Sequence, residues 1–249
     1  MNEKIVTAAV LVIGDEILSG RTKDRNIGYI AEYLANIGVD LREARVVPDI
    51  EDEIVAALNA LRARYDYVFT TGGIGPTHDD ITADAVAKAF GAPIDEDPRA
   101  LALMRARYKS DELSVARRRM ARMPVGAELV DNPVSPPPGF RIGNVIVMAG
   151  VPAVMQAMLD TASKALETGT KMTVQTIDAS AIPEGRYAEA LGAIAAAQGG
   201  TIIGSYPSYA DGTFRNQIVV RGRDPAKVAA TQAAVEAMLA KIRAAAKPA

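Results

Sequence analysis

The residues best suited to chemistry form a glycine-rich turn at residues 71–80, directly after a short apolar run. Its glycines, Gly72, Gly73 and Gly75, let a ligand approach backbone N–H groups closely. The helix predicted after the turn adds unpaired donors and a partial positive charge at its start. Phosphate suits such a turn, so we expect an anionic ligand there.

The turn matches neither of the two common nucleotide-binding motifs. No Gly-Lys-Ser/Thr follows it, and His78 stands where the dinucleotide fingerprint has its third glycine. The alternative is a plain strand-to-helix turn capped by Asp79 or Asp80. Its position favours a ligand, because ligands of open α/β sheets collect beyond the carboxyl ends of the strands.

Acidic and amide side chains follow other predicted strands at the same edge: Asp15, Glu16, Asp24, Asn26 and Asp49. Several carboxylates beside a phosphate-binding turn would repel a bare polyphosphate, so we expect a divalent metal, Mg, Mn or Co. We predict Asp15 and Asp80 as metal ligands, and Asp80, Asp49 and Asp15 as the catalytic carboxylates. For Asp49, a helix N-cap is the stronger interpretation.

Two further features have open interpretations. His78 is the only histidine, and it is either a phosphate or metal partner or an uninvolved loop residue. The arginines at positions 117–119, with Arg122, either clamp an anion or form a solvated helix face, and the solvated face is the commoner meaning of such a run.

The elements that position these residues alternate along the chain. Apolar runs predict strands at residues 5–13, 39–47, 67–71 and 145–148, and helical spacing predicts helices at 27–37, 54–61, 80–90 and 153–166. Strands that alternate with helices favour a layered, mostly parallel α/β sheet. Gly38 and Gly91 are typical of helix C-terminal caps.

The pattern weakens between residues 167 and 171, which predicts two domains, 1–168 and 171–249. The second domain follows the order strand, helix, strand, strand, helix, with a hairpin near Asp211-Gly212. That order is typical of a small α+β domain of the split βαβ kind.

Composition excludes several function classes. The 249 residues include 28 basic and 30 acidic side chains and no cysteine. A formal net charge of −2 gives no bulk attraction to nucleic acid or to an anionic membrane. Without cysteine there are no disulfides, thiolate metal sites or cysteine nucleophiles. We expect a cytoplasmic protein with a small-molecule partner.

Several motifs resemble the molybdopterin-binding fold family: residues 14–20, 24–26, 72–82, 132–133, 138–140 and 150–152. Within that family the sequence is similar to the N-terminal domain of competence/damage-inducible protein A and to the corresponding domain of eukaryotic FAD synthases. The resemblance implies a three-layer α/β domain with a smaller C-terminal domain, and a homo-oligomer, dimer or trimer.

The resemblance also implies a function and a ligand site. Relatives of this type include metal-dependent nucleotide pyrophosphatases that act on FAD or ADP-ribose, and more distant relatives bind molybdopterin. The expected ligand-binding residues are Gly72, Gly73, Gly75, Pro76, Thr77, Asp79, Thr82, Asp24, Asn26, Asn132, Gly150 and Pro152.

The sequence departs from the family pattern at three places. Arg25 stands where the family usually has threonine, residues 135–137 read Ser-Pro-Pro, and Val154 replaces a glutamate. If that glutamate is needed for catalysis, the chain binds a pterin or nucleotide without turning it over. This non-catalytic role in molybdenum-cofactor or flavin metabolism is the alternative hypothesis.

Overall fold

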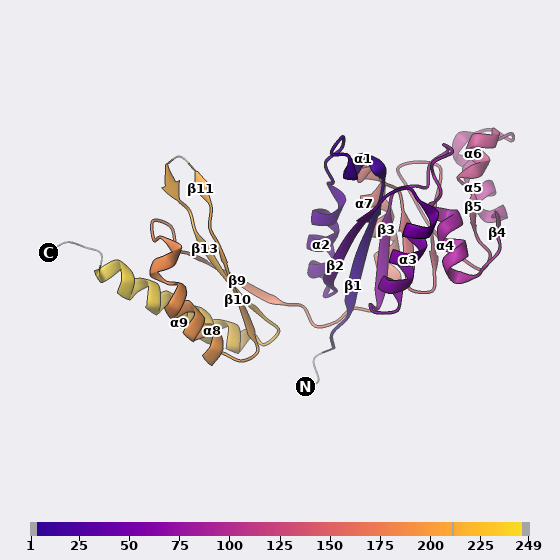
Figure 1. Ribbon diagram of the computed structural model, residues 1–249. Helices are drawn as coiled ribbons and strands as arrows, with labels where there is room; N and C mark the ends of the chain where they lie inside the picture. The colour runs from indigo at the N-terminus through magenta and orange to yellow at the C-terminus, as the bar shows by residue number, and fades with distance from the viewer. Residues whose placement is uncertain (1–3, 211, 246–249) are drawn as a thin grey trace. The chain divides into compact units, whose positions relative to one another are not determined.

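The computed structural model describes residues 4–210 and 212–245 (Figure 1). It contains two compact units, Lys4–Gly169 and a second that begins at Thr170. The strands of the first unit are β1 (Thr7–Ile13), β2 (Asp40–Val47), β3 (Tyr67–Thr71), β6 (Glu128–Val130), β7 (Gly139–Ile142) and β8 (Val145–Met148). They form one sheet in the order β2-β1-β3-β8-β7-β6.

The sheet is mostly parallel, as predicted. Strand β1 pairs in parallel with β2 and β3, and β3 with β8, whereas β7 is antiparallel to both β8 and β6. All seven β1 residues except Thr7 are buried, because helices cover both faces of the strand.

Three layers result from the alternation of side chains along each strand. Ala8, Val10 and Val12 of β1 belong to the core beneath α2 (Asn26–Ile37) and α7 (Pro152–Ala162). Ala9 and Leu11, which alternate with them, belong to the core beneath α3 (Glu51–Arg62) and α4 (Thr82–Phe90). The three-layer α/β architecture is therefore confirmed.

The helix ends confirm one set of predictions and correct another. Gly38 and Gly91 take left-handed conformations at the ends of α2 and α4. The predicted N-caps are wrong: α3 begins after Ile50 and α4 after Ile81, and neither helix has a side-chain cap. The Asp49 carboxylate instead accepts a hydrogen bond from the N–H of Asp15.

An excursion from the sheet lies between α4 and β6. It contains β4 (Ile94–Glu96), α5 (Pro98–Tyr108), α6 (Val115–Arg119) and β5 (Arg122–Pro124), and β4 pairs antiparallel with β5. The sequence pattern of residues 92–124 predicts only helix, because three-residue strands are too short to show alternation.

The second unit is a three-stranded antiparallel sheet with helices on one face. Its elements are β9 (Thr173–Asp178), η2 (Glu184–Arg186), α8 (Ala188–Ala197), β10 (Thr201–Tyr206), β11 (Tyr209–Ala210), β12 (Thr213–Phe214), β13 (Gln217–Gly222) and α9 (Pro225–Ala245). The order β10-β13-β9 places β13 between two strands joined through α8, the predicted split βαβ arrangement. Tyr187, Ile218 and Val235 lie in its core. Of the predicted hairpin turn, Asp211 lies outside the described residues.

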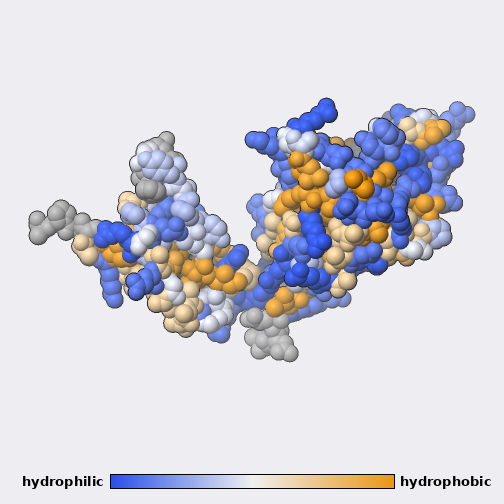
Figure 2. All heavy atoms as spheres, viewed as in Figure 1, coloured by the Kyte–Doolittle hydropathy of each residue, from blue (hydrophilic) through white to orange (hydrophobic). Residues whose placement is uncertain are grey.

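Polar residues dominate much of the face of the first unit seen in Figure 2, with hydrophobic residues in scattered patches. Among residues 4–210 and 212–245, no helix combines the length and apolar character that crossing a membrane requires.

Candidate functional site

A cleft with two lobes lies where β1, β3 and β8 end. Lobe 1 has a volume of about 460 Å³ and is lined by Val12, Ile13, Glu16, Ile17, Arg21, Thr22, Lys23, Asp24, Arg25, Asn26, Thr71, Gly72, Gly150 and Pro152. Lobe 2 has a volume of about 520 Å³ and is lined by Glu16, Thr22, Gly72, Gly73, Ile74, Gly75, Asp80, Met120, Ser135, Pro137, Ala149, Gly150, Val151, Pro152, Val154 and Met158.

The two lobes adjoin, because five residues line both of them: Glu16, Thr22, Gly72, Gly150 and Pro152. These residues come from three chain segments that follow β1, β3 and β8. The lobes differ in character: lobe 1 is bordered by charged side chains, whereas much of lobe 2 is apolar. A long ligand with two unlike ends matches this shape.

The glycine-rich turn is held in a conformation that needs glycine. Gly72 has φ +103°, and a Cβ added there would lie 2.1 Å from the carbonyl oxygen of Ile13. The Thr82 hydroxyl donates to the carbonyl of Gly72 at 2.9 Å. A Cβ on Gly150 would lie 3.3 Å from the Cα of Gly72, so the two loops pass close to each other at the junction of the lobes.

Backbone donors in this turn are left unused by the protein. Within residues 4–210 and 212–245, the N–H groups of Gly73, Ile74 and Gly75 donate no hydrogen bond to a protein acceptor. All three residues line lobe 2. Consecutive unpaired amides of this kind form an anion-binding concavity.

Asp80 is fixed within the same turn. Its Oδ2 accepts from the N–H of Thr77 at 2.8 Å and from the Thr77 hydroxyl at 2.5 Å. Arg119 donates to the Asp80 carbonyl at 3.0 Å and so ties α6 to the turn. Asp80 lines lobe 2. Its other carboxylate oxygen, Oδ1, takes part in neither of the bonds to Thr77.

Asp49 and Asp15 lie beside the cleft and line neither lobe. The N–H of Asp15 donates to Asp49 Oδ2 at 3.0 Å. Partial burial raises the pKa of Asp49 above its usual value, and the negative charges of Asp15, Glu16 and Asp79 raise it further. The hydrogen bond from the N–H of Asp15 acts in the opposite direction and lowers the pKa of Asp49. The acids around the cleft therefore repel one another.

Removing the Asp49 charge should stabilise the fold. Because the folded-state pKa is raised, the native state loses stability as pH rises through that pKa, and Asp49→Asn removes this loss. At neutral pH we expect a gain of at most about 1 kcal/mol, since the group is partly solvated. The gain should vanish near pH 3, where Asp49 is protonated. Thermal unfolding of both proteins across this pH range measures it, and a pH-independent difference would contradict the mechanism.

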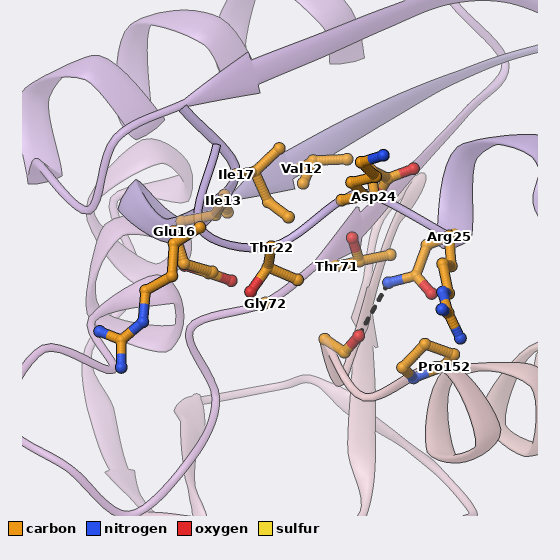
Figure 3. Close-up of a pocket in the computed structure, with 14 residues that line it drawn as sticks. Val12, Ile13, Glu16, Ile17, Thr22, Asp24, Arg25, Thr71, Gly72 and Pro152 are labelled. Atoms are coloured by element: carbon orange, nitrogen blue, oxygen red, sulfur yellow. Dashed lines mark hydrogen bonds between the residues drawn. The ribbon is translucent and has the colours of Figure 1, made fainter. Parts of the chain in front are cut away.

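Two buried polar side chains form the floor of lobe 1. Asn26 is 5% exposed, and its Nδ2 donates to the carbonyl of Gly150 at 2.9 Å, the bond drawn in Figure 3. Among the described residues, Asn26 Oδ1 and the hydroxyl of Thr71, which is 1% exposed, have no hydrogen-bond partner. Buried polar atoms without partners are uncommon, and a bound water or a ligand can complete their bonding.

The structure divides the expected site residues between the cleft lining, the exposed part of the turn and positions outside both. The cleft lining includes Gly72, Gly73, Gly75, Asp80, Asp24, Asn26, Gly150 and Pro152. The exposed residues Pro76, Thr77 and Asp79 lie on the turn outside the lining. His78 is also exposed there, and its side chain is 100% accessible.

Thr82 and Asn132 make hydrogen bonds within the protein behind the cleft lining. Both are fully buried and line neither lobe. Thr82 holds the carbonyl of Gly72. The Asn132 amide donates to Ser135 Oγ and the carbonyl of Pro137, and its Oδ1 accepts from the N–H groups of Val134 and Ser135. The donors and the acceptor of its side chain therefore all bind residues 134–137, which include Ser135 and Pro137 in the wall of lobe 2.

The arginine run is engaged with the protein. Arg117 stacks over the Tyr108 ring, with its guanidinium carbon 4.0 Å from the ring centroid, and Arg118 pairs with Glu96. Arg119 contacts the Asp80 carbonyl. The described contacts therefore favour structural roles for the run over an anion clamp.

Lining residues that sequence patterns did not indicate include Arg21, Thr22, Lys23, Met120 and Met158. Glu16 was noted at the predicted edge, and it lines both lobes, whereas its neighbour Asp15 lines neither. In the described residues, no three or more acidic or histidine side chains form a group able to hold a metal ion. The donors thus fit a cation shared with a ligand phosphate, as Mg²⁺ is usually held, better than a resident ion.

Comparison with known proteins supports two domains of known type. The family described as "Probable molybdopterin binding domain" matches residues 9–168, and the family described as "FAD synthase, middle domain" matches residues 171–247. A protein of Caldivirga maquilingensis is 40% identical over 161 residues, which cover 62% of this chain and 63% of that protein.

Other relatives show the same pattern. A CinA-like protein of Citrifermentans bemidjiense is 42% identical over 158 residues, which cover 61% of this chain but only 38% of that protein. The crystal structure of the protein CinA from Thermoplasma acidophilum matches with a TM-score of 0.61 and 36% identity, and covers 64% of this chain and 97% of that one. The chain thus spans less than two thirds of the length of the curated relatives described here. It belongs to the probable molybdopterin binding domain family.

Proposed function

We propose that the protein is a metal-dependent pyrophosphatase that hydrolyses a dinucleotide such as FAD or ADP-ribose. The observation that carries the proposal is the pair of adjoining lobes, with unpaired amides in the lining of lobe 2. A dinucleotide has two bulky ends and a narrow pyrophosphate between them. Each lobe lies within the usual size range of small-molecule pockets, about 300–1,000 Å³.

The proposed pose assigns each part of the ligand to one part of the cleft. The amides of Gly73, Ile74 and Gly75 bind non-bridging oxygens of the pyrophosphate. A flat ring system packs in lobe 2 against apolar side chains such as Met120 and Met158. The polar end of the ligand occupies lobe 1.

The residues also suit phosphate-anhydride hydrolysis. Asp80 Oδ1 and the ligand phosphates would together hold a divalent cation. When bound, that cation would neutralise part of the pyrophosphate charge. Glu16, which lines both lobes, would accept a proton from water as that water attacks phosphorus. The bridging P–O bond breaks, and the products are two phosphate monoesters. Asp15 and Asp49, outside the lining, have a supporting electrostatic role.

The direct test is an assay for AMP. Purified protein is incubated with FAD, ADP-ribose or NADH and with Mg²⁺, Mn²⁺ or Co²⁺, and products are separated by chromatography. We expect metal-dependent AMP release from at least one substrate, and loss of that release with a chelator. No AMP from any combination would overturn the enzymatic proposal.

A second candidate function is binding of a pterin or nucleotide without turnover. Val154 favours it, because this apolar side chain lines lobe 2 at the position where the family resemblance places a glutamate. Calorimetry separates the two functions, since a binding module retains its ligand chemically unchanged.

Restoring the carboxylate should distinguish a slow enzyme from a binding module. In Val154→Glu, a carboxylate enters lobe 2 beside Asp80 and Glu16, and we expect AMP release to rise by about tenfold or more. Val154→Gln, of similar shape but uncharged, is the matched control and should give no gain. If Val154→Glu binds substrate but hydrolyses no faster than the wild type, the missing glutamate does not limit turnover.

A further inference from the structure

The rim of lobe 1 concentrates positive charge in a chain that is negative overall. Arg21, Lys23 and Arg25 are exposed, line lobe 1, and form no ion pair in the described residues. The lining carboxylates are Glu16 and Asp24, so three cations face two acids. Asp24 Oδ1 is engaged by the N–H of Ile27 at 2.9 Å.

Lobe 2 has the opposite balance. Its lining includes the carboxylates of Glu16 and Asp80 and no lysine or arginine. In Figure 3, Glu16 and Arg25 lie on opposite sides of Thr71. The cleft is therefore electrically asymmetric, and a ligand with unequal charge at its two ends is bound in one direction.

The floor of lobe 1 indicates a second chemical group. Asn26 Oδ1 and the Thr71 hydroxyl are buried without partners, and the bond from Asn26 Nδ2 to Gly150 fixes which way the amide points. Asn26 Oδ1 is an acceptor, so a donor such as a ribose hydroxyl suits it. A sugar bound on this floor would share lobe 1 with Arg21, Lys23 and Arg25.

From this arrangement, and resting on the proposed function, we infer that the protein favours dinucleotides whose ribose carries an extra phosphate monoester. The Asn26–Thr71 floor binds the ribose and the cationic rim binds the monoester, while the turn holds the pyrophosphate. One of the three cations is Arg25, at a position where the family resemblance leads us to expect threonine. This selects NADPH-like over NADH-like ligands.

The test compares NADPH with NADH, which differ only in one phosphate. Affinities are measured by calorimetry on the full chain at low salt with a chelator present, so that binding is separated from turnover. We expect NADPH to bind about tenfold more tightly, because charge-assisted hydrogen bonds add to the attraction. The ratio should fall towards one at about 0.5 M salt, where screening is strong.

Variants locate the effect. Arg25→Gln and, separately, Lys23→Gln should each lower the NADPH to NADH affinity ratio by about threefold or more. Arg105→Gln, which removes an equally exposed charge on α5 outside both lobes, should leave the ratio unchanged. Equal affinities for NADPH and NADH in the wild type overturn the inference alone. Failure of NADPH, NADH, FAD and ADP-ribose all to bind, both with the chelator and with Mg²⁺, Mn²⁺ or Co²⁺ added, overturns the proposed function as well.

Discussion

Glu16→Gln should lower the rate of AMP release by about 100-fold, with little change in dinucleotide affinity, the effect typical of losing a general base. Glu16 is the carboxylate that lines both lobes, and it lies at their junction beside Gly72. Glutamine keeps the size and hydrogen-bonding shape of the side chain but does not accept a proton from water. The measurement is kcat and KM for the best substrate of the wild type.

The controls separate a chemical role from a general loss of negative charge. Glu53→Gln changes an exposed glutamate on α3 outside both lobes, and its kcat should stay within about twofold of the wild type. A decrease in affinity without a decrease in kcat for Glu16→Gln would assign Glu16 to binding. Unchanged kinetics would remove it from the site.

The scaffold follows closely from sequence patterns. The nearly unbroken apolar run of β1 predicts a central strand covered on both faces, and the structure buries it in that way. Gly38 and Gly91 end α2 and α4 in left-handed conformations, as their positions predict. These features depend on local composition and spacing, which a single sequence contains.

The details of the site depend on orientation, which spacing does not provide. Asp15 and Glu16 are neighbours in the short helix α1 (Asp15–Leu18), so their side chains point in different directions, and only Glu16 enters the cleft lining. Met120, directly after α6, and Met158, within α7, reach lobe 2 from segments far apart in sequence. Their contribution requires the packed fold.

The polar residues show the same limit in another form. Asp49 has the composition and position of an N-cap, yet its carboxylate binds the N–H of Asp15 across a chain separation of 34 residues. Asn132 was expected at the ligand, yet all the hydrogen bonds of its side chain stay within residues 132–137. For such residues, the sequence predicts that a polar contact is made but not which partner makes it.

The largest effect on both stability and binding is expected from Gly72→Ala. Gly72 has φ +103°, which L-residues rarely adopt, and an alanine Cβ would lie 2.1 Å from the carbonyl oxygen of Ile13. Because that oxygen belongs to the backbone of Ile13, which is buried in the central strand β1, the turn must move instead. We expect a loss of about 2–4 kcal/mol in the free energy of unfolding, measured by denaturant titration.

The same displacement should abolish dinucleotide binding at temperatures where the variant is still folded, because it moves the unpaired amides of Gly73, Ile74 and Gly75 away from their common direction. Gly28→Ala is the matched control: Gly28 lies within α2, has no atom within 4 Å of an added Cβ, and should gain about 0.5–1 kcal/mol. A folded Gly72→Ala protein that binds FAD or ADP-ribose as the wild type does would mean that the turn does not hold the pyrophosphate. Since the lobes meet over Gly72, a dinucleotide would then have no anchor at its centre, and the pose across both lobes would be wrong.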